Sequence, residues 1–305
     1  MVKTTKYIDL EQFSIRPITN VVQLPGGEFH PKITEYGDAL ATEFCIRTRL
    51  RDGNDVMKLL TVTNAIRKYR QGIEISAFIP YIPGGRQDRV SNQGEAFTLQ
   101  VYADLINAQN YKNVFTVDPH SDVTTALINN CQVQSLNTII RAVLNGYDTI
   151  IIPDAGASKK IYSYYLKNML YDHIKIVQAV KTRDTVTGKL SGFKVLCEPG
   201  ELNDRSAIIL DDICDGGGTF LGLAAELDTQ HPTLGKLGLY VTHGIFSKGF
   251  DDLFNTFDEV CTTTSWASKD EYIDRLTVIP ANAEFPLHND PVYVENYQKL
   301  HIIDL

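Results

Sequence analysis

The sequence lacks the features of a disulfide-stabilised, zinc-binding or membrane-spanning protein. Its five cysteines are scattered, and no two of them are spaced as a CxxC pair. An odd number of separated cysteines argues against a disulfide framework and against a structural zinc site. No stretch approaches the ~20 apolar residues of a membrane-spanning helix, and the opening MVKTTKYIDLEQF has no apolar signal-peptide segment. We therefore expect a protein of the reducing cytoplasm.

The sequence also lacks an excess of basic residues. It has 29 Lys and Arg against 37 Asp and Glu, which gives a net charge of -8. A nucleic acid would be repelled overall by this charge, so the composition argues against a nucleic-acid partner. A small polyanion is still compatible, because a local group of N–H donors and a few cations outweighs a distant net charge.

What is present is an ordinary globular composition with alternating strand and helix patterns. The 305 residues are 43% hydrophobic, enough for one large or two modest domains. Apolar runs predict strands at residues 73–79, 113–117, 149–152, 173–180, 206–210, 236–243 and 258–263, and helical spacing predicts helices at 98–109, 158–168 and 220–227. Strands that are apolar throughout are buried on both faces, which is typical of a parallel sheet covered by helices. The sequence thus predicts two α/β domains with a junction near residues 131–140.

One segment, AIILDDICDGGGTF (residues 207–220), carries the functional argument. A buried strand is followed by the paired carboxylates Asp211 and Asp212, then by three glycines, and Thr219 is expected to open a helix. Glycines let the backbone approach a ligand closely, and the N-terminus of a helix offers free N–H donors and a positive dipole. A phosphate is therefore expected at the glycines. The two carboxylates would repel a phosphate, but they suit the vicinal hydroxyls of a ribose.

Two common nucleotide-binding loops are excluded by the same segment. It lacks the GK[ST] ending of the Walker loop, and its carboxylates precede the glycines, unlike those of the dinucleotide fingerprint. The alternative without function is a glycine turn with a solvated acidic rim. The coincidence of strand, acid pair, triple glycine and helix start favours the ribose-phosphate interpretation.

The segment resembles the phosphoribosyl-diphosphate (PRPP) binding loop of type I phosphoribosyltransferase-like proteins. Further segments resemble, in the same order, those of one branch, the ribose-phosphate pyrophosphokinases: NDVMKLL (54–60), IPYIPGGRQDR (79–89), VDPHS (117–121), IPDAGASKK (152–160) and VTHGIFS (241–247). The resemblance implies two tandem type I phosphoribosyltransferase-like domains, each a mainly parallel sheet flanked by helices. It implies boundaries at 1–135 and 136–288, with a tail, 289–305, that packs back on the N-terminal domain.

The resemblance also implies a reaction. The C1 hydroxyl of ribose 5-phosphate attacks the β-phosphorus of ATP in the presence of Mg²⁺, and PRPP and AMP are formed for nucleotide or NAD synthesis. Subunits would pair as a homodimer or a larger homo-oligomer, so that sites share residues. The compact form is similar to accessory or viral members of the family that feed NAD salvage, and a viral member would act in the host cytoplasm.

Residue roles follow from the same resemblance. ATP would be held by Arg86, Gln87, Asp88 and Glu28, the last of which would reach adenine across a subunit interface. Catalysis would fall to Lys181, Arg183 and His120, with His120 and Asp154 as metal ligands. The ribose phosphate would be bound by residues around the glycines: Asp211, Asp212, Asp215, Gly216, Gly217, Gly218, Thr219 and Lys159.

Gly216 departs from the family pattern, Asp-Thr-x-x-Thr, and this leaves the acceptor open. It removes a hydroxyl donor, which is worth about 1.5–3 kcal/mol when the partner is charged, and it adds room. The acceptor is then either ribose 5-phosphate or a larger ester such as ADP-ribose. Two other functions are alternatives. One is a phosphoribosyltransferase that consumes PRPP, which needs no second domain with the RQDR segment. The other is a catalytically silent regulatory homologue, which need not keep Lys181, Arg183 and His120.

Overall fold

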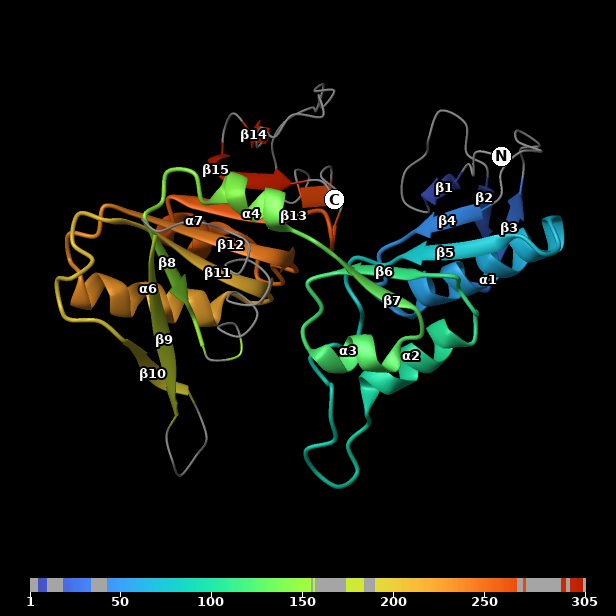
Figure 1. Cartoon of the computed structure of the whole chain (residues 1–305), viewed down its shortest axis with the longest axis horizontal. Helices are drawn as coiled ribbons and strands as arrows, with labels where there is room; N and C mark the ends of the chain where they lie inside the picture. The colour runs from blue at the N-terminus through green and yellow to red at the C-terminus, as the bar shows by residue number, and fades with distance from the viewer. Residues whose placement is uncertain are drawn as a thin grey trace. The chain divides into compact units, whose positions relative to one another are not determined.

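The chain folds into two compact units, residues 1–134 and 135–305, in a computed structural model (Figure 1). The structure describes residues 5–9, 19–33, 43–154, 156, 174–183, 190–267, 271–272, 292–294 and 297–303. Within these residues, no helix has both the length and the apolar character needed to cross a membrane.

The first unit contains a five-stranded parallel sheet in the order β1-β4-β5-β6-β7. Its strands are β1 (Thr5–Asp9), β4 (Glu43–Arg47), β5 (Glu74–Phe78), β6 (Val114–Val117) and β7 (Cys131–Gln134). The helices between them are α1 (Gly53–Tyr69), α2 (Thr98–Asn107) and α3 (Asp122–Leu127). From β4 onward the sheet grows by one strand after each helix. Right-handed crossovers that advance in one direction put these helices on one face of the sheet.

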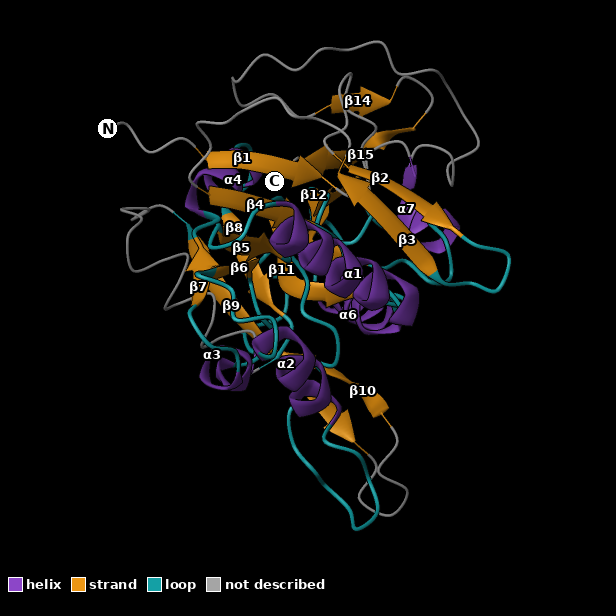
Figure 2. Ribbon diagram, turned by 90° about the vertical axis from the view of Figure 1, so that its right-hand side faces the viewer, coloured by secondary structure: helices purple, strands orange, loops and turns teal. Residues whose placement is uncertain are grey.

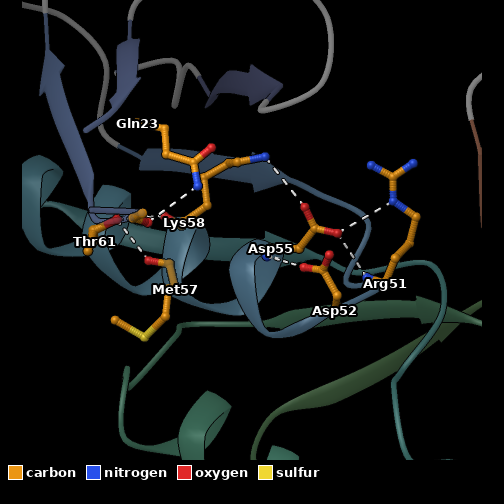
Figure 3. Close-up of polar contacts among 8 residues, drawn as sticks. Gln23, Arg51, Asp52, Asp55, Met57, Lys58 and Thr61 are labelled. Atoms are coloured by element: carbon orange, nitrogen blue, oxygen red, sulfur yellow. Dashed lines mark hydrogen bonds and ion pairs between the residues drawn. The ribbon is translucent and has the colours of Figure 1, made fainter. Parts of the chain in front are cut away.

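Helix α1 has a well-defined start that is visible in Figure 3. Asp52 is the N-cap, and its carboxylate accepts a hydrogen bond from the backbone N–H of Asp55 at 3.0 Å. The nearly buried carboxylate of Asp55 in turn accepts from the backbone N–H of Arg51, at 3.0 Å, and from Lys58 Nζ, at 3.4 Å. The buried side chains recur at helical spacing and pack into the core: Val56, Leu59, Val62, Thr63 and Ile66.

A separate two-stranded hairpin lies beside α1. Its antiparallel strands are β2 (Thr19–Gln23) and β3 (Phe29–Ile33), and Figure 2 shows them next to the helix. The Lys58 ammonium lies 5.7 Å from the centre of the Phe29 ring, which is within cation–π range. The hairpin turn therefore projects from a strand that is held on α1.

The second unit contains an eight-stranded, mostly parallel sheet in the order β10-β9-β8-β11-β12-β13-β15-β14. Its strands are β8 (Thr149–Ile152), β9 (Lys175–Arg183), β10 (Leu190–Val195), β11 (Ser206–Cys214), β12 (Lys236–Gly244), β13 (Glu259–Thr263), β14 (Val292–Val294) and β15 (Tyr297–Ile303). Only β10 and β14, at the two ends, run antiparallel to their neighbours. The helices are α4 (Asn137–Val143), α6 (Gly218–Gln230) and α7 (Asp251–Thr256).

Each unit has a hydrophobic cluster of its own. In the first unit the cluster joins the sheet to α1 and α2, and its fully buried members include Ile46, Leu59 and Leu99. In the second unit the cluster joins the sheet to α6 and α7, and its members include Ile209 and Leu223. The two clusters share no residue. The α/β class, with mainly parallel sheets flanked by helices, is confirmed.

The structure corrects several boundaries. β11 continues to Cys214, so the paired carboxylates lie inside the strand and not after it, and α6 begins at Gly218, one residue before Thr219. β9 extends past the predicted end at residue 180 to Arg183, where it pairs with the antiparallel strand β10. The tail was expected on the first unit, but residues 297–303 pair with β13 of the second. The expected helix 158–168 lies outside the described residues.

Candidate functional site

The second unit has a topological switch point between β8 and β11. β8 comes first in the chain, β9 lies on one side of it, and β11 lies on the other. The chain therefore continues from β8 toward β9 on one side and from β11 toward β12 on the other. The crevice at the carboxyl ends of such strands is the usual ligand site of an open α/β sheet.

Charged side chains converge at this switch point. Asp154 follows β8, and its Oδ2 accepts a 2.8 Å hydrogen bond and ion pair from Nζ of Lys181 on β9. Burial raises the pKa of the Asp211 carboxyl on β11, and the nearby negative charges of Asp212 and Asp154 raise this pKa further, whereas Lys181 opposes the shift. The sequence separates these residues widely, but the three adjacent strands bring them to one place.

The glycine loop (residues 215–219) follows β11 directly. Gly217 is the N-cap of α6 and has φ +75°, a left-handed conformation that a residue with a Cβ rarely adopts. No side chain caps the helix within the described residues, and the N–H groups of Gly218 and Thr219 have no acceptor one turn earlier in the helix. An anion placed here would accept hydrogen bonds from these two N–H groups.

A second turn braces the glycine loop from the side. The backbone N–H groups of Ile245 and Phe246 donate to the Cys214 carbonyl at 2.8 and 3.1 Å, and that of Ser247 donates to the Asp215 carbonyl at 3.1 Å. The side chain of Phe246 is fully buried, and its ring lies 4.8 Å from that of Phe250. This support was missed at the sequence level, where VTHGIFS was noted only as a resembling segment. The left-handed φ of +47° at Phe246 has no sequence signature.

In the first unit, the loop that holds Arg86, Gln87 and Asp88 follows β5. Gly84 has φ +76°, and a Cβ there would lie 2.9 Å from the backbone nitrogen of Leu99, the second residue of α2. The Gln87 N–H donates to the Gly84 carbonyl at 2.8 Å and closes the turn. Tight packing against the start of α2 thus fixes where the exposed Arg86 leaves the backbone.

The same loop adjoins the predicted catalytic histidine. His120 lies in the segment between β6 and α3, and its Cβ is 3.5 Å from the position a Cβ would take on Gly85. Pro80 joins the two segments, because its carbonyl accepts from the Val117 N–H at 3.2 Å and the Thr116 hydroxyl at 3.0 Å. The structure therefore brings the Arg86 loop and His120 together at the carboxyl ends of β5 and β6.

The remaining predicted residues lie on the β2–β3 turn, at the end of β9 and in both units. Glu28 ends the exposed turn between β2 and β3, where Gly27 N–H donates to the Leu24 carbonyl at 2.8 Å. Arg183 is the last residue of β9, and its side chain lies outside the described part of the structure, as does all of Lys159. His120 and Asp154, the predicted metal ligands, belong to different units. Among the described residues, no three acidic, histidine or cysteine side chains form a metal-binding group.

Comparisons with known proteins agree on one family. No protein-family model matches the chain. A ribose-phosphate pyrophosphokinase of Mycoplasmopsis pulmonis is 27% identical over 218 residues, which cover 70% of this chain and 65% of that protein. Ribose-phosphate pyrophosphokinase 3 of Saccharomyces cerevisiae is 28% identical over 256 residues, 81% of this chain and 74% of that one. The chain thus spans slightly less than two thirds of the first of these relatives.

A solved structure extends the likeness to the fold of almost the whole chain. The crystal structure of phosphoribosylpyrophosphate synthetase from Mycobacterium smegmatis aligns with a TM-score of 0.72 at 16% identity, and covers 99% of this chain and 95% of that one. At this identity the match speaks for the fold alone. The curated relatives, at 27% and 28% identity, make the chain similar to ribose-phosphate pyrophosphokinases.

Proposed function

We propose that the protein transfers the β,γ-pyrophosphate of ATP to the C1 hydroxyl of ribose 5-phosphate and forms PRPP and AMP. One observation carries the proposal: the Lys181–Asp154 ion pair and the half-buried Asp211 adjoin a glycine loop that opens a helix at the sheet's switch point. This arrangement offers N–H donors for an anion, carboxylates and a cation at one end of the sheet. The names of the curated relatives support the same reaction.

The acceptor would bind at the glycine loop. The N–H groups of Gly218 and Thr219 would donate hydrogen bonds to the 5-phosphate, and the positive end of the α6 dipole would stabilise its charge. Asp215, Gly216 and Gly217 would shape the turn around it. Asp211 and Asp212 would accept hydrogen bonds from the ribose diol. These bonds would stabilise the ionised form of Asp211, which desolvation disfavours.

The nucleotide would bind at the 79–89 loop. Arg86 would pair with the phosphates of ATP, with Gln87 and Asp88 beside it, since a guanidinium suits phosphate oxygens. Glu28, on its projecting turn, would reach the adenine of a neighbouring subunit in a homo-oligomer. His120, which adjoins the same loop, would face the transferred group.

The carboxylate of Asp154 fits Mg²⁺, which takes oxygen ligands and usually binds proteins through one or two carboxylates plus substrate phosphates. Asp154 would be one ligand, and its charge already acts on Asp211; His120 is the other predicted ligand. When bound, the ion would neutralise charge on the phosphates of ATP. A cluster of three protein ligands is not required for such a site.

For the transfer itself, the protein needs to position the two substrates in line and to place positive charge around the transferred group. The C1 oxygen would form a bond to the β-phosphorus while the bond from that phosphorus to the α,β-bridging oxygen breaks. AMP would leave with this oxygen, and the hydroxyl proton would be released. Lys181 and Arg183 would stabilise the charge that grows on the transferred group, because both lie near the end of β9, next to the switch point.

The second candidate is the same transfer to ADP-ribose, in an NAD salvage route. Gly216 favours it, because the loop lacks the hydroxyl donor that the family pattern offers to a simple monophosphate. PRPP formation would instead serve nucleotide or NAD synthesis. Either reaction would take place in the cytoplasm.

The test is to incubate the protein with ATP and Mg²⁺ and to measure AMP by chromatography with ribose 5-phosphate, with ADP-ribose and with no acceptor. AMP that appears only with ribose 5-phosphate supports the first proposal, and AMP only with ADP-ribose supports the second. No AMP with either acceptor would contradict both and would point to a silent homologue. AMP without acceptor would contradict transfer to a sugar.

A further inference from the structure

The side chain of Lys248 lies beside Gly216 of the glycine loop. A Cβ on Gly216 would lie 3.3 Å from Lys248 Cε, 3.4 Å from Cδ and 3.6 Å from Cγ. The aliphatic part of this lysine therefore occupies the space beside Gly216 that a side chain would otherwise fill. Lys248 has no part in the proposed reaction.

The backbone fixes the origin of this side chain. Lys248 follows Ser247, whose N–H donates to the Asp215 carbonyl, and precedes Gly249, whose N–H donates to the Phe246 carbonyl at 2.9 Å. The buried Phe246 anchors the turn in the aromatic core. Lys248 is thus one residue away from a direct hydrogen bond to the glycine loop, and it is exposed at the surface.

The positive charge of Lys248 is available to an anionic ligand at the glycine loop. Within the described residues, no carboxylate is found in an ion pair with its ammonium. The stem runs along a loop whose next residues, Gly218 and Thr219, present the uncapped N–H groups of α6. The Lys248 ammonium at the tip of this stem and the N–H donors at the helix start would both favour binding of an anion.

We propose that Lys248 is a specificity-determining residue that contacts the phosphate on C5 of the acceptor. The inference rests on the proposed function, in which the glycine loop binds that phosphate. Lys248 would supply the donor that Gly216 lacks. A flexible ammonium, unlike a short hydroxyl, is able to follow the phosphate of either a monoester or a diphosphate ester, so both ribose 5-phosphate and ADP-ribose are probes of the site.

The experiment compares the Lys248→Met variant with wild-type protein by calorimetric binding and steady-state kinetics. The Kd and KM for ribose 5-phosphate, or for ADP-ribose if that is the acceptor used, should rise about tenfold or more, because a charge-assisted contact is lost. The KM for ATP should change less than about twofold. Lys68→Met is the control: Lys68 is an exposed lysine at the end of α1 in the other unit, and it should change neither constant.

A second variant separates contact from fold. Gly216→Thr in a Lys248→Ala background, in which the stem is removed, supplies a hydroxyl in the vacated space, and it should recover most of the affinity for ribose 5-phosphate that Lys248→Ala loses. If wild-type protein turns over but Lys248→Met keeps its Kd and KM for the acceptor, the inference is wrong and the proposed function stands. If wild-type protein binds ribose 5-phosphate without turnover, the proposed reaction is wrong and the Kd comparison still decides the inference. Wild-type protein that binds neither acceptor contradicts both.

Discussion

Lys181 Nζ lies 2.8 Å from Asp154 Oδ2, so a cation on one strand is paired with a carboxylate that follows the adjacent strand. Both side chains are only partly exposed. The pair holds Lys181 beside Asp211. The charge of Lys181 lowers the pKa of Asp211, but the opposing effect of burial is larger. Asp154 therefore restrains the residue that we propose to act on the transferred phosphates.

Replacing Lys181 with alanine should lower kcat by about a hundredfold or more, because a cation that stabilises growing charge acts mainly in the transition state. The KM values for ATP and acceptor should change little. Lys175→Ala is the matched control, since Lys175 lies on the same strand and pairs with Glu201 instead. Steady-state kinetics checks both variants, and an unchanged kcat with a raised KM would contradict the role given to Lys181.

Asp211→Asn should stabilise the second unit at neutral pH while it impairs acceptor binding. The folded-state pKa of Asp211 is raised, so the unfolded chain loses this proton first as pH increases. Folding stability from this group therefore falls as pH rises from the ordinary aspartate range toward the folded-state value. An uncharged asparagine avoids this loss, so its advantage in thermal melting should be small near pH 4 and larger at pH 7.

The control for this prediction is Asp228→Asn, at an exposed position on α6. Its melting temperature should follow that of wild-type protein at both pH values. A lower melting temperature for Asp211→Asn at pH 7 would mean that the buried carboxylate is stabilised in the fold by partners that asparagine cannot replace.

Gly217→Ala should destabilise the second unit by about 1–2 kcal/mol, because the left-handed backbone disfavours a Cβ. The added carbon would also press on Leu253, 3.2 Å away. Gly218→Ala is the comparison, since a Cβ at Gly218 meets open space. Urea unfolding measures both, and equal free energies of unfolding would show that the loop relaxes without cost.

Gly84→Ala tests the nucleotide loop in the same way. Gly84 and Gly94 both have positive φ, but only Gly84 has backbone within reach of an added Cβ. We expect Gly94→Ala to cost about 1 kcal/mol and Gly84→Ala to cost more, with a raised KM for ATP as Arg86 shifts. Similar unfolding curves and similar KM values for the two variants would contradict this picture of the loop.

The sequence predicted much of the second unit because its strands are apolar throughout. The prediction at 149–152 matches β8, and that at 206–210 lies within β11. The continuation of β11 to Cys214 was missed, because adjacent aspartates are typical of a strand end, whereas here hydrogen bonding to β12 continues beyond Asp211 to Cys214.

The arrangement around the site was less accessible from sequence. The glycines and acids of the 207–220 segment indicated an anion site, but nothing local links Asp154 to Lys181, which are 27 positions apart. The approach of Lys248 to Gly216 depends on a left-handed phenylalanine held by tertiary packing. Roles for Arg86, His120 and Glu28 came from the family resemblance and stay predictions.

The separate hydrophobic clusters have a consequence for cooperativity. Because no residue belongs to both, heating need not melt the chain in one all-or-none step, and a single unfolding temperature would then describe neither half. Calorimetry should resolve two endotherms. Saturating ribose 5-phosphate should move only the one that reports on residues 135–305, since a ligand shifts the equilibrium of the body that holds it.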